Sequence, residues 1–150
     1  GQAAGSTELI GGQMEDIEAE RTPATRDQVD FIHNGKTAAM IACSLALGGL
    51  VGGADEAQLA ALRRLGRAVG LAFQTVDDVL DATATSAELG KTAGKDAQSQ
   101  KATMVRVLGL AGARERAAAH TAAALAELSK LPGDTAFLHA LVESLLHRSN

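Results

Sequence analysis

Apolar residues recur at helical spacing along almost the whole chain. The clearest stripe lies within residues 55–82, where apolar side chains follow one another in steps of three and four: Leu62, Leu65, Val69, Ala72, Val76 and Val79. Helices are also predicted over residues 1–20, 26–50, 102–110, 113–131 and 135–147, separated by Thr22-Pro23, the glycines of 48–53 and Pro132-Gly133. The pattern predicts an all-α fold, a helical bundle that forms one domain over residues 1–150.

The helical pattern breaks over residues 83–102, which are rich in Thr, Ala, Ser, Gly and Lys. A loop of this length in a compact domain is usually functional or disordered. It carries Lys91, Lys95 and Lys101 among small residues, which fits a phosphate-binding lid. On its own such a loop is more often a solvent-exposed surface, so the lid gains weight only beside a carboxylate cluster. Gly90-Lys91-Thr92 is not the end of a nucleotide P-loop, because Thr85 stands where that motif requires Gly and a helix precedes the segment.

Composition narrows the class of protein. The 150 residues are 46% hydrophobic and 21% charged, as in one globular domain, whereas the net charge of −4 and 2% aromatic residues argue against nucleic-acid binding. The most apolar stretch, residues 38–53, is shorter than the roughly 20 residues of a membrane span, so none is expected. The single cysteine, Cys43, and the absence of a visible targeting signal favour a reducing cytoplasm.

Three carboxylates near the end of the helix predicted over 55–82 share one side of it: Asp77, Asp78 and Asp81. Like charges one turn apart destabilise a helix by roughly 0.2–0.5 kcal/mol, and no Lys or Arg occurs between Arg67 and Lys91 to compensate. Clustered carboxylates without a basic neighbour suit Mg²⁺, which completes its shell with water and phosphate oxygens. The alternative is a solvent-exposed acidic face near a helix end.

Two smaller polar groups precede this cluster. His33, Lys36 and Thr37 lie at helical spacing just before an apolar run, where the ammonium of Lys36 needs a phosphate or a carboxylate, or else reaches solvent. Gln13 and Asp16 share a face after Gly11-Gly12, a pair that permits close helix packing, although an ordinary exposed polar face explains them as well.

The order of these features resembles the C-terminal half of the trans-isoprenyl diphosphate synthases, or polyprenyl synthetases. This is the farnesyl and geranylgeranyl diphosphate synthase family, and the chain is most like its bacterial short-chain members. The resemblance covers nearly the whole chain. It rests on Gly11-Gly12-Gln13 with Asp16, His33-x-x-Lys36-Thr37, Phe73-Gln74-x-x-Asp77-Asp78-x-x-Asp81, and Leu89-Gly90-Lys91-x-x-Gly94-x-Asp96 with Lys101.

This resemblance implies a bundle of long helices around a central cavity. It also implies Mg²⁺-dependent condensation of isopentenyl diphosphate with an allylic diphosphate, in which the allylic diphosphate group leaves and a proton is lost. Metal ligation would fall to Asp77, Asp78 and Asp81, and diphosphate binding to Lys36, Lys91 and Lys101. Gln13 and Asp16 would contact substrate and, with Thr37 and Gln74, line the cavity near the allylic carbon. Catalytic roles would belong to Lys36, Thr37 and Gln74.

The family's first aspartate-rich motif, with its following arginine pair, has no match in residues 1–150, and the upstream residues that bind isopentenyl diphosphate are absent too. The chain is therefore expected to hold half of a site, to have at most traces of activity alone, and to pair as a homodimer or with a complementary N-terminal half. One alternative is a non-catalytic scaffold subunit that dimerises with an intact synthase. Another is a terpene cyclase, whose usual Asn/Ser/Glu metal motif differs from Asp77-Asp78-x-x-Asp81.

Overall fold

The computed structural model describes the chain except residues 22, 84–100 and 148–150, and the side chains of 146 and 147. Its elements in order are η1 Gln2–Ala4, α1 Leu9–Ala19, α2 Arg26–His33, η2 Asn34–Ala38, α3 Ala39–Val51, α4 Glu56–Thr83, α6 Met104–Leu128 and α7 Ala136–His147. Here η1 is a 3₁₀ turn and η2 is a single π-helical turn. The described residues contain no strand, so the predicted all-α fold is confirmed.

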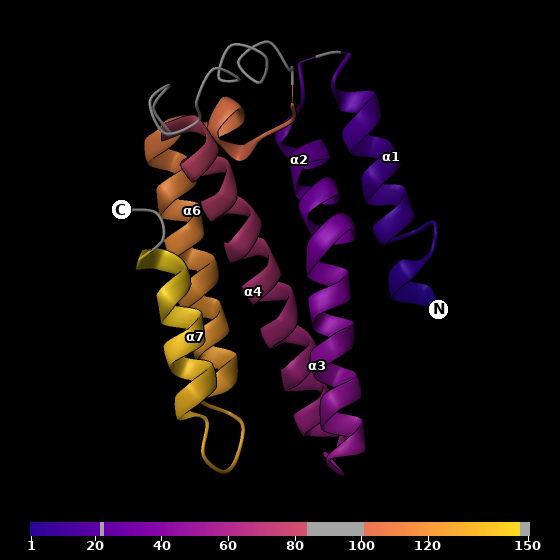
Figure 1. Ribbon diagram of the computed structural model, residues 1–150, viewed down its shortest axis with the longest axis vertical. Coiled ribbons are helices and arrows are strands. Elements are labelled where there is room, and N and C mark those ends of the chain that lie inside the picture. The colour runs from indigo at the N-terminus through magenta and orange to yellow at the C-terminus, as the bar shows by residue number, and fades with distance from the viewer. Residues whose placement is uncertain (22, 84–100, 148–150) are drawn as a thin grey trace, which may run out of the picture.

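The helices lie side by side in the order α1, α2 with α3, α4, α6 and α7 (Figure 1). The long helix α4 packs against α3 on one side and against α6 on the other. One core cluster joins α2, α4 and the first half of α6, and its largest fully buried members include Val29, Val79 and Met104. A second cluster joins α4, α6 and α7 around Leu65 and Leu128. Both faces of α4 are therefore committed to packing.

The contact of α4 with η2 and α3 is made at backbone level. A Cβ atom at Gly66 would collide with the backbone of Ala42, and one at Gly70 with Ala38. Because real Cβ atoms almost never come this close, only glycine fits at these two positions of α4. The two glycines fix the register of α4 against the turn that carries Lys36.

The structure changes three predicted helix boundaries. The helix predicted over residues 1–20 is shorter, because α1 begins at Leu9 and only the turn η1 precedes it. Residues 26–50 do not form one regular α-helix, because the η2 turn separates α2 from α3. The two helices predicted over residues 102–110 and 113–131 are both present, but they meet at a kink at Gly109 within α6, which runs from Met104 to Leu128. The backbone there (φ 73°, ψ 169°) lies in a region that essentially only glycine adopts, so Gly109 alone is enough to interrupt the helix.

The combined run Arg26–Val51 is 26 residues long and contains an 18-residue window with a mean hydropathy of 1.2, which is long and apolar enough to cross a membrane. The prediction against a membrane span was based on the shorter stretch of residues 38–53, and that length argument was wrong. One such helix is weak evidence for a span, because core helices of soluble proteins pass the same test. In this bundle the run contacts α1 through Gly35 and α4 through Ala38 and Ala42.

Candidate functional site

The η2 turn, which carries Lys36 and Thr37, is crossed closely by α1. A Cβ at Gly12 would lie 2.5 Å from the backbone nitrogen of Lys36, and one at Gly35 would lie 2.7 Å from the carbonyl oxygen of Glu8. The two backbones are therefore in contact at a pair of buried glycines. Single π-helical turns are rare and frequently lie at functional sites. The crossing brings the next turn of α1 alongside Lys36.

Lys36 is held by Asp16 of that turn. The Lys36 Nζ atom lies 2.6 Å from Asp16 Oδ2, and the two side chains are 35% and 22% exposed. Of the two anions that the sequence allowed for Lys36, the structure shows a carboxylate. A lysine that is partly buried and presented at the edge of a helix crossing can also donate to a phosphate oxygen that approaches from solvent.

A second ion pair ties α4 to the same turn. Arg67 Nη2 lies 2.7 Å from Glu8 Oε1, and Arg67 Nη1 donates to the carbonyl oxygen of Asn34 at 3.1 Å. Asn34 is the first residue of η2, so Arg67 links the turn to both α1 and α4. The turn is thereby held from two sides.

Asp78, one of the three predicted metal ligands, already has protein partners. Its Oδ2 atom accepts a hydrogen bond of 2.6 Å from the backbone N–H of Met104, the first residue of α6. The same atom lies 3.4 Å from Nε2 of His33, whose side chain is only 4% exposed. The Asp78 carboxylate therefore lies between the end of α2 and the start of α6.

The three aspartates predicted to hold a metal ion differ in their surroundings. Asp81 is exposed, and within the described ranges no three His, Cys, Asp or Glu residues form a group that could hold a metal ion. All three lie on one side of a helix wheel, but a helix wheel does not show the backbone N–H group of Met104 that Asp78 binds. The three-carboxylate metal site stays a prediction.

The remaining predicted site residues differ in how far they are buried. Thr37 and Gln74 are partly buried, whereas Gln13 is exposed. Lys101 is exposed, and its carbonyl oxygen accepts a hydrogen bond of 3.3 Å from Arg106 Nη1. Lys91 lies outside the described residues. The structure thus brings Lys36 together with Asp16 but leaves the other predicted contacts untested.

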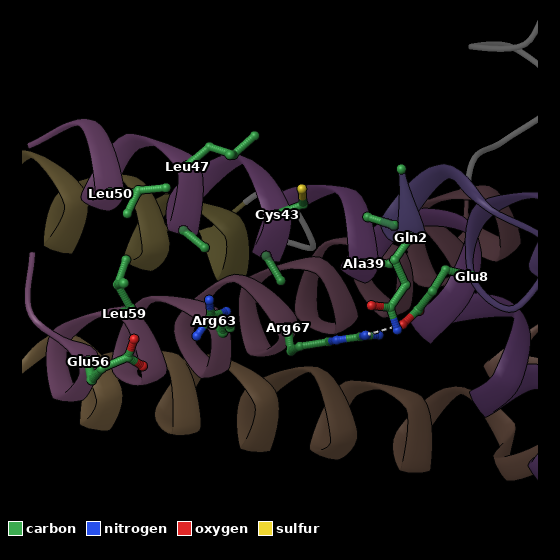
Figure 2. A pocket seen from close by; sticks show the side chains of 14 residues that line it. Gln2, Glu8, Ala39, Cys43, Leu47, Leu50, Glu56, Leu59, Arg63 and Arg67 are labelled. Atoms are coloured by element: carbon green, nitrogen blue, oxygen red, sulfur yellow. Dashed lines mark hydrogen bonds and ion pairs between the residues drawn. The ribbon is translucent and has the colours of Figure 1, made fainter.

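A groove of about 520 Å³ runs between α3 and α4, with η1 at one end (Figure 2). Leu47, Leu50 and Leu59 line one end of it, and the Arg67–Glu8 pair lies at the other. Of the predicted site residues that the structure describes, none lines this groove. The groove and the Lys36–Asp16 pair are therefore separate sites. Arg67 contacts both regions, because it lines the groove and binds the η2 turn that carries Lys36.

Comparison with known proteins decides the family. The polyprenyl synthetase family profile matches residues 3–139 of the chain. The chain belongs to the polyprenyl synthetase family. The resemblance inferred from the order of its motifs is thereby confirmed.

Relatives of this polyprenyl synthetase chain include geranylgeranyl and farnesyl diphosphate synthases. A chloroplastic geranylgeranyl pyrophosphate synthase of Catharanthus roseus is 41% identical over 148 residues, which are 97% of this chain and 42% of that protein. A farnesyl diphosphate synthase of Geobacillus stearothermophilus is 37% identical over 149 residues, 99% of this chain and 50% of that protein. The chain therefore spans about half the length of these relatives.

The fold agrees with solved members of the family. A geranyltransferase of Helicobacter pylori, solved as a complex with magnesium and isoprenyl diphosphate, superposes with a TM-score of 0.75 at 32% sequence identity. The match covers 97% of this chain and 49% of that one. The helices described here thus have the arrangement of about half of a polyprenyl synthetase.

Three residues of this polyprenyl synthetase domain escaped the sequence reasoning: Glu8, Arg67 and the partner role of His33. Glu8 and Arg67 are 59 positions apart, so no local pattern pairs them. A signal was present for the crossings themselves, because Gly66 and Gly70 lie one turn apart on α4, as do Ala38 and Ala42 on the facing segment. Small residues at this spacing indicate close helix packing.

Proposed function

We propose that this chain supplies the diphosphate-binding side of a trans-prenyltransferase site, one that joins isopentenyl diphosphate to an allylic diphosphate. The observation that carries the proposal is the placement of Lys36, which a buried glycine crossing and a π-helical turn hold beside Asp16. Family membership supports the reaction type, and relatives that make farnesyl or geranylgeranyl diphosphate support short-chain products.

In this reaction the allylic C–O bond breaks, negative charge develops on the leaving diphosphate, a C–C bond forms to isopentenyl diphosphate, and a proton is lost. Lys36 and Lys101 would bind the leaving diphosphate and neutralise its charge, together with Lys91. Thr37 and Gln74, with Gln13, would contact the substrate near the allylic carbon. The partly buried positions of Thr37 and Gln74 suit a reacting centre from which water is excluded.

The residues predicted to hold Mg²⁺ are Asp77, Asp78 and Asp81 near the end of α4, and Oδ2 of Asp78 is also bound by the N–H of Met104. Mg²⁺ commonly uses one or two carboxylates and takes its other ligands from water and phosphate, so it does not need all three. When bound, Mg²⁺ would act as a Lewis acid toward the leaving diphosphate.

The proposed site is incomplete in this chain, which spans about half the length of its relatives. We expect the missing part to come from a complementary N-terminal half or from a second subunit, and the isolated chain to have at most traces of prenyl transfer. A non-catalytic scaffold subunit is the second candidate. The exposed apolar residues Ile10, Met14 and Ile17 on α1 favour a partner in either case.

Thermal unfolding with and without Mg²⁺ and pyrophosphate tests the proposal. A ligand at about 100 times its Kd stabilises the folded state by about 2.7 kcal/mol, so the wild-type chain should melt several degrees higher with both present. Lys36→Met should lose most of this shift. Lys130→Met is the matched control. Lys130 lies just beyond the end of α6, is about half exposed and pairs with Glu127 of that helix.

The outcomes separate the two candidate functions. Absence of any Mg²⁺-dependent shift in the wild-type chain would contradict a surviving diphosphate site and support the scaffold subunit. A shift that persists in Lys36→Met would remove Lys36 from the site. Normal turnover by these 150 residues alone, in a coupled assay for diphosphate release, would contradict the incomplete site.

A further inference from the structure

The Asp78 carboxylate joins three helices. It belongs to α4, it accepts the N–H of Met104 at the start of α6, and it faces His33 at the end of α2. Its side chain is 14% exposed and that of His33 is 4% exposed, so the contact is shielded from water. A polar contact shielded in this way is stronger than one at the surface, and the loss of either partner leaves the other unsatisfied.

The start of α6 depends on this contact. The first N–H groups of a helix have no partner within the helix. In α6 the N–H of Met104 is bound by Asp78, and that of Arg106 is bound by the Thr103 hydroxyl at 3.3 Å. A carboxylate at a helix N-terminus is also favoured by the helix dipole. Asp78 thus holds the first turn of α6 in place.

Two lysines assigned to the diphosphate lie at equal distances along the chain from this contact. Lys36 follows His33 by three residues, and Lys101 precedes Met104 by three. The carbonyl oxygen of Lys101 is bound by Arg106 of the same first turn, so the backbone of Lys101 moves with the start of α6. The His33–Asp78–Met104 contact is therefore a short structural link between the two lysines.

We propose that His33 and Asp78 are positioning residues that fix Lys101 with respect to Lys36, and that Asp78 serves this purpose and not metal ligation. The inference rests on the proposed function for the roles of the two lysines. The link itself is observable without any activity.

Amide hydrogen exchange at Met104, measured by NMR on the whole chain, tests the link. Asp78→Ala and His33→Leu should each raise the exchange rate of the Met104 N–H by about tenfold or more. Asp78→Asn and His33→Gln keep an acceptor and a donor, respectively, and should stay within about threefold of wild type. If Asp78→Ala or His33→Leu fails to fold, these milder variants still test the link.

The matched control is the pair His139–Glu143 on α7, which has the same separation of 3.4 Å but is about half exposed. Glu143→Ala should leave exchange at Met104 unchanged. Unchanged exchange at Met104 in both Asp78→Ala and His33→Leu would overturn the proposal. So would an increase that Glu143→Ala reproduces.

A second readout concerns the ligand. In thermal titrations with Mg²⁺ and pyrophosphate, Asp78→Asn should keep the wild-type affinity within about threefold, whereas a metal ligand would lose about tenfold or more. A large loss of affinity with the Met104 N–H still protected would show that Asp78 is a ligand, and would overturn its assigned role. If the wild-type chain shows no shift, the proposed function fails, while exchange at Met104 still decides whether the link exists.

Discussion

His120 of α6 is a partly buried histidine whose Nε2 atom has no hydrogen-bond partner among the described residues. Burial lowers its pKa below the ordinary value of 6.5, and the nearby charge of Arg116 lowers it further, while Asp30 acts in the opposite direction and His33 adds to the lowering. Arg116 itself is bound to Asp30, which leaves little of that carboxylate for His120. The folded protein therefore holds His120 neutral.

The lowered pKa of His120 makes stability depend on pH. As the pH falls through 6.5 toward the lower pKa of the folded state, His120 binds a proton in the unfolded chain but not in the folded chain. The stability present at neutral pH is therefore lost in acid. We expect the melting temperature of the wild-type chain to fall between about pH 7.5 and 5.5, and that of His120→Gln to fall less. His139→Gln, at an exposed histidine of α7, is the control. Equal pH dependence of wild type and His120→Gln would contradict this cause.

Residue chemistry was predictable from the sequence where a charged side chain shows by its own setting that it needs a partner, and not where the partner is a backbone group. The charge of Lys36 just before an apolar run required an anion, and Asp16 supplies it. The partner of Asp78 is a backbone N–H group 26 positions away, which no side-chain pattern encodes. For this reason the sequence grouped Asp78 with Asp77 and Asp81, while the structure assigns it contacts of its own.

At the scale of elements, the crossing of α1 and η2 is expected to be sensitive to a single methyl group. Gly12→Ala would place a Cβ 2.5 Å from the Lys36 nitrogen, so the two backbones must separate. We expect a loss of about 1–3 kcal/mol in the free energy of unfolding, as for overpacked cores, measured by urea denaturation. The same variant should weaken the Mg²⁺-dependent response to pyrophosphate, because Lys36 moves away from Asp16.

Gly48→Ala is the matched control for this prediction. Gly48 lies in α3 with nothing within 4 Å of its Cβ position, so an added methyl group meets no neighbour there. Alanine in a helix interior is more favourable than glycine by roughly 0.5–1 kcal/mol, and Gly48→Ala should therefore stabilise the chain slightly. Equal stability changes in Gly12→Ala and Gly48→Ala would show that the crossing is not tight.

Helix α4 was predicted to within one residue at each end, because its apolar stripe from Leu62 to Val79 repeats over about five turns. The η2 turn was not predicted, since a π-helical turn depends on tertiary contacts such as those of Gly35 and Arg67 rather than on spacing. The sequence predicts a break at residues 111–112, two residues after the observed break at Gly109. Glycine is tolerated inside helices, so its presence alone does not show which one adopts a positive φ.

At the scale of the whole molecule, apolar surface is left uncovered on α1. Ile10, Met14 and Ile17 are 54%, 51% and 47% exposed and lie at helical spacing, and Phe31 of α2 is 46% exposed. A stripe of this kind marks an interaction surface. In a chain that spans half of its relatives, such a surface agrees with the expected partner.

We therefore expect the isolated chain to associate. Sedimentation velocity across a range of concentrations should show a concentration-dependent increase in mass, and Met14→Lys, at the centre of the stripe, should weaken association by about tenfold, equivalent to about 1.4 kcal/mol. Val51→Lys, at the fully exposed end of α3, makes the same chemical change away from the stripe and should have little effect. A monodisperse monomer at every concentration would contradict this prediction.

The π-helical turn η2 has a consequence for the direction in which every later residue of α3 points. A π turn accommodates one residue more than an α-helical turn, and each residue of an α-helix advances the side-chain direction by about 100°. If Asn34–Ala38 formed a regular α-helix with the same five residues, the side chains of α3 would point about 100° away from their observed directions, and Ala42 would no longer face Gly66. Deleting one residue from the turn should instead remove the π turn and leave Ala42 facing Gly66, so the π turn is what lets this run of residues satisfy α1 and α4 at once.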